Sequence, residues 1–85
     1  MSVPSVVIEA VLKSPDVCAI RFSGRLDRQS RGGLFEAIRT AIADNTREIE
    51  VDLADVYDVD PSVLGMMFTL RDKAKATGKS LSVAY

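Results

Sequence analysis

The sequence predicts a single α/β domain, residues 1–85, in which a four-stranded, mostly parallel sheet carries two helices on one face. The third strand supports this most directly, because Ile49, Val51 and Leu53 point one way and the acidic residues between them point the other. A sheet covered on both faces needs a nearly continuous apolar strand at this position. Two successive right-handed strand–helix–strand crossovers also place both helices on the same face.

An antiparallel hairpin is expected to open the domain. Residues 6–12 are rich in β-branched side chains and predict the first strand, which residues 13–16, Lys-Ser-Pro-Asp, bring to an end. The second strand, residues 17–23, alternates so that one face carries Cys18, Ile20 and Phe22. This position indicates that Cys18 is a core thiol rather than a reactive one.

The first helix and the third strand come next along the chain. Residues 24–27, Gly-Arg-Leu-Asp, are expected to leave the sheet, and the helix is expected to begin near Ser30 or a few residues later. Its buried stripe has helical spacing and consists of Leu34, Ala37, Ile38, Ala41 and Ile42. Residues 44–46 end this helix, and residues 48–53 form the third strand.

The joint after the third strand contains the candidate functional residues. A short acidic loop leads to Asp60, which suits a helix N-cap, and to Pro61, which suits the first helical position. Ser62 then lies among free backbone N–H groups at the positive end of the helix dipole, which favours an anionic oxygen or a phosphoryl group. The helix is expected to run to about Thr77, and residues 80–85 predict a fourth strand.

The second helix carries more apolar surface than one buried face requires. Its main stripe, which should face the sheet, contains Val63, Met66, Met67, Leu70 and Ala74. Leu64 and Phe68, four residues apart, form a second ridge beside that stripe. Two interpretations stay open: the ridge completes the core against the first helix, or it is a docking patch beside the Ser62 turn.

Composition and charge exclude several classes of function. A net charge of −1, from 11 basic and 12 acidic residues, argues against a nucleic-acid-binding protein. With one cysteine and no histidine, the chain has no internal disulfide, no Cys/His metal set and no histidine-based catalytic triad. The spacing of Asp52, Asp55, Asp58 and Asp60 does not fit a calcium loop. We therefore expect a protein that is not an enzyme and uses no metal and no cofactor.

The sequence has neither a signal-peptide pattern nor a run of about 18 apolar residues that would span a membrane. We therefore expect a cytoplasmic protein with no membrane insertion.

Three stretches together resemble the STAS family, whose simplest members are anti-sigma-factor antagonists. They are residues 59–67, Val-Asp-Pro-Ser-Val-Leu-Gly-Met-Met, residues 51–53, Val-Asp-Leu, and residues 23–27, Ser-Gly-Arg-Leu-Asp. The family typically shows a strand ending in Gly-x-Leu-Asp and, later, Asp-Ser-Ser-Gly-Leu-Gly opening a helix. Order and spacing match over most of the chain. Pro61 replaces the first serine of that motif, and Val63 replaces its usual glycine or alanine.

The resemblance implies a regulatory domain that binds a protein partner, an anti-sigma factor that is also a serine kinase, with a phosphatase to reverse the modification. Ser62 is the implied phosphorylation site, and its hydroxyl is expected to lie uncovered. The implied partner-binding residues are Asp27, Asp58, Asp60, Pro61, Ser62, Leu64 and Phe68.

Two alternatives remain open at this point. One is a STAS accessory subunit that is not phosphorylated and regulates a transporter or another signalling complex. The other is a module that binds a nucleotide or a small ligand. Family members usually continue into a final helix after the fourth strand, whereas this sequence stops at Tyr85. That difference suggests a sheet edge that a homodimer or a partner would cover.

Overall fold

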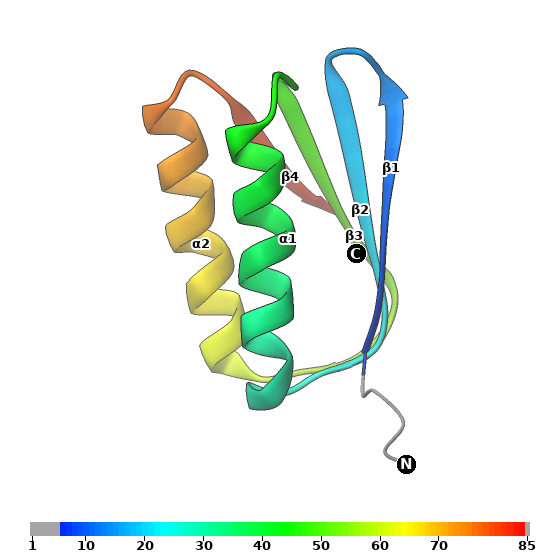
Figure 1. Cartoon of the computed structure of the whole chain (residues 1–85). Coiled ribbons are helices and arrows are strands. Elements are labelled where there is room, and N and C mark those ends of the chain that lie inside the picture. The colour runs from blue at the N-terminus through cyan, green and yellow to red at the C-terminus, as the bar shows by residue number, and fades with distance from the viewer. Residues whose placement is uncertain (1–5, 85) are drawn as a thin grey trace.

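A four-stranded sheet with both helices packed on one of its faces forms the fold (Figure 1). The computed structural model describes residues 6–84. In chain order the elements are β1 (Val6–Ser14), β2 (Val17–Leu26), the 3-10 turn η1 (Arg28–Ser30), α1 (Arg31–Ala43), β3 (Glu48–Val59), α2 (Pro61–Ala76) and β4 (Ser80–Ala84). The strands follow the order β1-β2-β3-β4, with β1 antiparallel to β2 and the other pairs parallel. The predicted fold class is confirmed.

Three strands are longer than the sequence pattern predicted, and the first of them, β1, continues through residues 13–14. Residues 24–26 continue β2, and residues 54–59, expected as an acidic loop, continue β3. The two extensions pair with each other as far as Leu26 and Val59, after two register shifts, and Gly24 takes a positive φ of 104° between them. The expectation that the chain leaves the sheet at residue 24 is therefore wrong for residues 24–26, and it leaves at Asp27. Pairing satisfies the backbone groups of these polar segments, although their side chains suggest a loop.

The core lies between the inner face of the sheet and the two helices. It contains the alternating residues of the strands and one stripe from each helix: Ile20, Phe22, Leu26, Leu34, Ile38, Ala41, Ile49, Val51, Leu53, Val63, Met67, Leu70, Ala74 and Leu81. The outer face carries ion pairs between Lys13 and Glu50, at 2.8 Å, and between Arg21 and Asp52, at 3.4 Å. The predicted alternation between an apolar and a solvated face is therefore correct.

Local signals define the ends of the helices. The Asp27 carboxylate accepts hydrogen bonds from the Ser30 N–H, at 3.0 Å, and from the Ser30 hydroxyl, at 2.9 Å, and α1 begins at the next residue. The α1 stripe is buried as predicted, except that Ala37 and Ile42 are only half-buried. Gly78 ends the last turn after α2 with a φ of 79°, which glycine adopts without strain.

Two details complete the comparison with the sequence pattern. Cys18 packs against the core but is only half-buried, and burial raises the pKa of its thiol. Tyr85, which the pattern places in the fourth strand, lies outside the described residues.

The core predicts a sharp contrast between two substitutions in α2. Leu70 is 1% exposed, so Leu70→Ala leaves a cavity and should lower the free energy of unfolding by about 2–5 kcal/mol. Asp72 is exposed on the same helix, and Asp72→Ala should change it by less than about 0.5 kcal/mol. Urea denaturation followed by circular dichroism measures both. Equal effects of the two substitutions would contradict the proposed packing of α2.

Candidate functional site

The N-terminus of α2 forms the joint that the sequence singled out. Asp60 is the N-cap, and its Oδ1 accepts the Ser62 N–H at 2.8 Å, while Pro61 occupies the first turn, where no N–H is needed. The Asp60 N–H in turn donates to the Leu26 carbonyl at 2.8 Å. This bond ties the start of α2 to the end of β2, so that Asp27 and Asp60 lie at the same edge of the sheet. The predicted cap is confirmed.

The charge of Asp60 is stabilised by its surroundings. The pKa of its carboxyl lies below the ordinary value, first because of the Ser62 side chain and then because of the Ser62 backbone N–H, with a further contribution from Arg28 and Arg31. Of the two Ser62 groups, only the N–H reaches hydrogen-bonding geometry, so the hydroxyl acts on the carboxylate by proximity. The carboxylate form therefore predominates at neutral pH.

The Ser62 hydroxyl is not uncovered, and that expectation is wrong. Its Oγ is buried, and it has no hydrogen-bond partner among residues 6–84. The residue as a whole is only half-buried, and Pro61 and Gly65 beside it are exposed. Because this position is in the first helical turn, no preceding turn restricts rotation of the side chain toward solvent.

Asp27 and Asp58 each contact another residue near this joint, Asp27 as a helix cap and Asp58 in an ion pair. Asp27 caps η1 through Ser30, so its carboxylate has a structural role. Asp58 lies near the end of β3, where its Oδ2 is 3.3 Å from the Nε of Arg25, and both side chains are exposed. The Asp27–Ser30 cap is a local contact across three residues, whereas the pairing of Asp58 with Arg25 depends on the strand extensions and was not indicated by the sequence.

A shallow surface lies between α1 and α2 next to this joint, and we call it the α1–α2 surface. Its volume is about 720 Å³, and it is lined by Arg31, Gly32, Phe35, Glu36, Met66 and Thr69. Ser62 precedes Met66 by four residues and Thr69 by seven, so all three lie on one side of α2. The sequence pattern did not identify Arg31, Gly32 or Phe35 as part of this surface.

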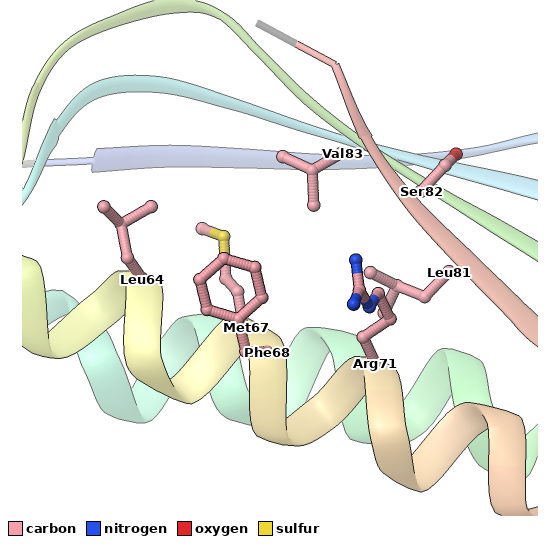
Figure 2. A pocket seen from close by; sticks show the side chains of 7 residues that line it. All are labelled: Leu64, Met67, Phe68, Arg71, Leu81, Ser82 and Val83. Atoms are coloured by element: carbon pink, nitrogen blue, oxygen red, sulfur yellow. The ribbon is translucent and has the colours of Figure 1, made fainter.

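Leu64 and Phe68 lie on the opposite flank of α2. Together with Met67 and Arg71 they face β4 across a groove (Figure 2). A helix turns by about 100° per residue, so Leu64 is about 200° around α2 from Ser62. Both interpretations of the ridge therefore need correction: it does not pack against α1, and it is not adjacent to Ser62.

Gly65 has no internal packing role that explains its presence in the helix. A Cβ added to it meets no atom within 4 Å, and the same holds for Gly32 on the α1–α2 surface. Glycine in a helix is less stable than alanine by about 0.5–1 kcal/mol. Since Gly65 is exposed beside Ser62, its small size leaves the α2 backbone accessible to another molecule.

Two further observations concern metal binding and membrane-spanning helices in the described part of the chain. Residues 6–84 contain no cluster of three or more side chains arranged to bind a metal ion. Within that same range, neither helix has the length and apolar character needed to cross a membrane.

The arrangement as a whole is similar to that of known proteins. Residues 10–85 match the family model described as Mlab, STAS domain. An anti-sigma factor antagonist from Mycobacterium paratuberculosis is similar with a TM-score of 0.84 and 21% identity, covering 98% of this chain and 70% of that one. An antisigma-factor antagonist STAS domain from Rhodobacter sphaeroides has a TM-score of 0.78 and 15% identity, covering 93% and 85%.

A third similar structure is that of a protein in its phosphorylated form. The Bacillus cell fate determinant SpoIIAA has a TM-score of 0.73 and 18% identity, covering 89% of this chain and 68% of that one. At these identities the structural matches establish a shared fold. No curated protein sequence matches the chain.

The cap predicts how stability depends on pH. Because the pKa of folded Asp60 is lowered, its stabilisation is complete above the ordinary value of 3.8 and is lost as the pH falls through the lowered value. Asp60→Asn keeps a good N-cap but cannot titrate. The difference in Tm between the wild-type protein and Asp60→Asn should therefore decrease from about pH 5 to about pH 2. A difference that stays constant across this range in thermal melts would contradict the role given to the carboxylate.

Proposed function

Because this chain belongs to the STAS domain family, we propose that it is a non-enzymatic regulatory domain that binds a protein partner, in the manner of an anti-sigma-factor antagonist. The partner docks on the α1–α2 surface and over the N-terminus of α2. The domain works in the cytoplasm, where a single free thiol such as Cys18 stays reduced.

One observation carries the proposal: an exposed glycine, Gly65, lies within α2 three residues after Ser62. Glycine at this position makes α2 less stable than alanine would. No atom lies within 4 Å of the place that a Cβ would take, so packing inside the domain does not require glycine. Close approach of a partner to the helix backbone accounts for it. Phe35 and Met66, both half-buried on the α1–α2 surface, supply apolar contact area for the same partner.

Phosphorylation of Ser62 by a partner serine kinase is the proposed switch, and a phosphatase reverses it. The hydroxyl must first rotate out of its buried position, and it has no hydrogen bond to break when it does so. The phosphate adds about 1.5–2 negative charges at neutral pH. The helix N-terminus offsets part of this charge, by about 0.3–1 kcal/mol, and Arg28 and Arg31 lie close to Asp60.

The consequence of this modification is a change in binding rather than in folding. The phosphate is tolerated at a solvated helix N-terminus, but its burial under a docked partner is costly unless the partner pairs with it. SpoIIAA, whose fold is similar, has a structure in a phosphorylated form, and this supports the proposal by analogy.

The buried position of Ser62 Oγ favours a second candidate function. In this alternative the domain is an accessory subunit of a transporter or of another signalling complex and binds its partner without phosphorylation. Pro61 supports the alternative, because it removes the hydroxyl that precedes Ser62 in the family motif and stiffens the turn. The two candidates share the docking surface and differ in whether ATP and a kinase change the binding.

A phosphorylation assay distinguishes the two functions. Incubation with ATP and the cognate serine kinase should place one phosphate on Ser62, which peptide mass mapping locates, and Ser62→Ala should remain unmodified. Ser62→Asp should weaken partner binding while leaving the Tm nearly unchanged, because a side chain in the first turn of α2 can rotate from the buried position toward solvent. Phosphate at another residue, or partner binding indifferent to kinase and ATP, would exclude the switch and leave the accessory-subunit function.

The docking surface is tested separately from the switch by Gly65→Ala. The substitution should raise the free energy of unfolding by about 0.5–1 kcal/mol, since a Cβ meets open space and alanine favours helix. It should also weaken binding of the partner recovered from native lysate, measured by titration calorimetry. Asp72→Ala, away from this surface, should leave binding unchanged. Greater stability with unchanged binding would show that the partner docks elsewhere.

A further inference from the structure

The α1–α2 surface is a groove between two helices that lie side by side (Figure 1). Phe35 from α1 and Met66 from α2 are half-buried in it, and both pack against the core. They form the apolar floor of the groove. The Thr69 hydroxyl, which also lines the groove, donates to the Gly65 carbonyl at 3.1 Å and is therefore engaged within its own helix.

A glycine borders the groove on each helix. Gly32 lines it on α1, and Gly65 directly precedes Met66 on α2. A Cβ added to either glycine would meet no atom within 4 Å, whereas a Cβ at Gly33 would lie 3.4 Å from the Ile8 side chain. Packing inside the domain therefore accounts for Gly33 and not for Gly32 or Gly65. Because the distance between packed helices depends on the side chains at their contact, the two glycines allow a third helix to approach closely.

The walls of the groove favour a helical occupant over an extended one. Both walls are helices, whose backbone groups are satisfied internally apart from the first and last turns. An extended segment would find almost no main-chain partners for the N–H and C=O groups on the side that it buries. A helix satisfies these groups within itself, and an apolar stripe along it can pack on Phe35 and Met66.

Two cations without an acidic partner border the groove. Arg31 lines it at the start of α1, and Lys73 extends from α2 so that its Nζ lies 5.9 Å from the centroid of the Phe35 ring. Neither cation forms an ion pair with another residue in the range 6–84. The carboxylate of Glu36, which also lines the groove, is already paired with Arg39 at 2.8 Å. The groove therefore favours an occupant that carries carboxylates.

We propose that the α1–α2 surface binds an amphipathic helix of the partner protein, in which an apolar stripe is flanked on both sides by acidic residues. The stripe packs on Phe35 and Met66, and the backbone of the docked helix lies close to Gly32 and Gly65.

The geometry of a helix places the two kinds of side chain correctly. In a heptad, positions e and g lie on either side of the stripe formed by positions a and d. When the stripe faces the floor of the groove, carboxylates at e and g therefore face its two walls, one formed by α1 and the other by α2. There they pair with Arg31 and Lys73.

The inference rests on the proposed function, since it concerns the same surface and the same partner, and it adds the chemistry of the segment that docks. It does not depend on phosphorylation of Ser62. A second copy of this chain does not meet the charge requirement. A symmetric pair of α1–α2 surfaces would bring Arg31 and Lys73 of one copy toward the same cations of the other.

Three synthetic peptides test the inference. The acidic peptide has three heptads, about 21 residues, with leucine at a and d and glutamate at e and g. The basic peptide has lysine at e and g instead, and the like charges keep either peptide from pairing with itself. The third peptide is the acidic one with a proline at its centre, which breaks the helix. Fluorescence anisotropy should show binding of the acidic peptide and at least about tenfold weaker binding of the other two.

Matched variants of the protein define where the acidic peptide binds. Gly32→Leu fills the groove from α1, and Lys73→Glu reverses one of its cations, so each should weaken binding about tenfold. Thr40→Leu adds a leucine to an exposed part of α1 that does not line the groove, and Arg71→Glu makes the same charge change on the β4 flank of α2. Both control variants should change the affinity less than about twofold. Circular dichroism should show all four variants folded, because the four positions are exposed.

Several outcomes would overturn the inference. They are no binding of the acidic peptide, equal binding of the basic or the proline-containing peptide, or an effect of Gly32→Leu or Lys73→Glu no larger than that of its control variant.

The peptides also separate this inference from the proposed docking of the native partner. If Gly65→Ala weakens binding of the partner and the acidic peptide does not bind, the docking surface is correct and the acidic helix is wrong. If the acidic peptide binds as expected and Gly65→Ala leaves binding of the partner unchanged, the proposed docking is wrong, and the groove is still a site for an acidic amphipathic helix.

Discussion

The hydrogen bond from the Asp60 N–H to the Leu26 carbonyl, at 2.8 Å, joins the start of α2 to the end of β2. It forms because β2 and β3 remain paired as far as Leu26 and Val59, so that both strands end at the same edge of the sheet. Asp27 and Asp60 then cap η1 and α2 side by side. The starts of the two helices consequently lie together at the lower end of the domain in Figure 1. Ser62 is in the first turn of α2.

Helix α2 presents three different surfaces around its circumference. Val63, Met67, Leu70 and Ala74 are buried against the sheet. On one side of this stripe Met66 and Thr69 border α1, and on the other side Leu64 and Phe68 border β4. Because the helix rotates by about 100° per residue, side chains two positions apart in sequence can serve separate surfaces. One helix therefore borders two separate hollows, one on each flank.

Helices cover only one face of the sheet, and this explains where apolar side chains remain exposed. Helices cover the inner face, and ion pairs such as Arg21–Asp52 keep the outer face solvated. Apolar side chains that exceed the needs of the core have no second layer to enter. Phe68 stays exposed on the flank of α2, and Val7, Val11, Leu12 and Tyr57 stay exposed on the strands. The α1–α2 surface and the groove between α2 and β4 lie on the two flanks of α2, and both are hollowed.

The sequence alone determined the fold class, the helix stripes and the start of α2, because these depend on local periodicity and capping. Asp60 and Pro61 specify a helix start through interactions within a few residues, whatever surrounds them. The family resemblance also depended on such local motifs, and it led to a correct fold.

Only the tertiary structure decided the features that depend on residues distant in the chain. The extension of β2 and β3 needs the pairing of residues 24–26 with residues 56–59, which neither segment reveals alone. The burial of Ser62 Oγ depends on what packs over the first turn of α2, and the position of Phe68 depends on β4 being an edge. Burial and edge position are properties of neighbours in space, so side-chain patterns along the chain did not contain them.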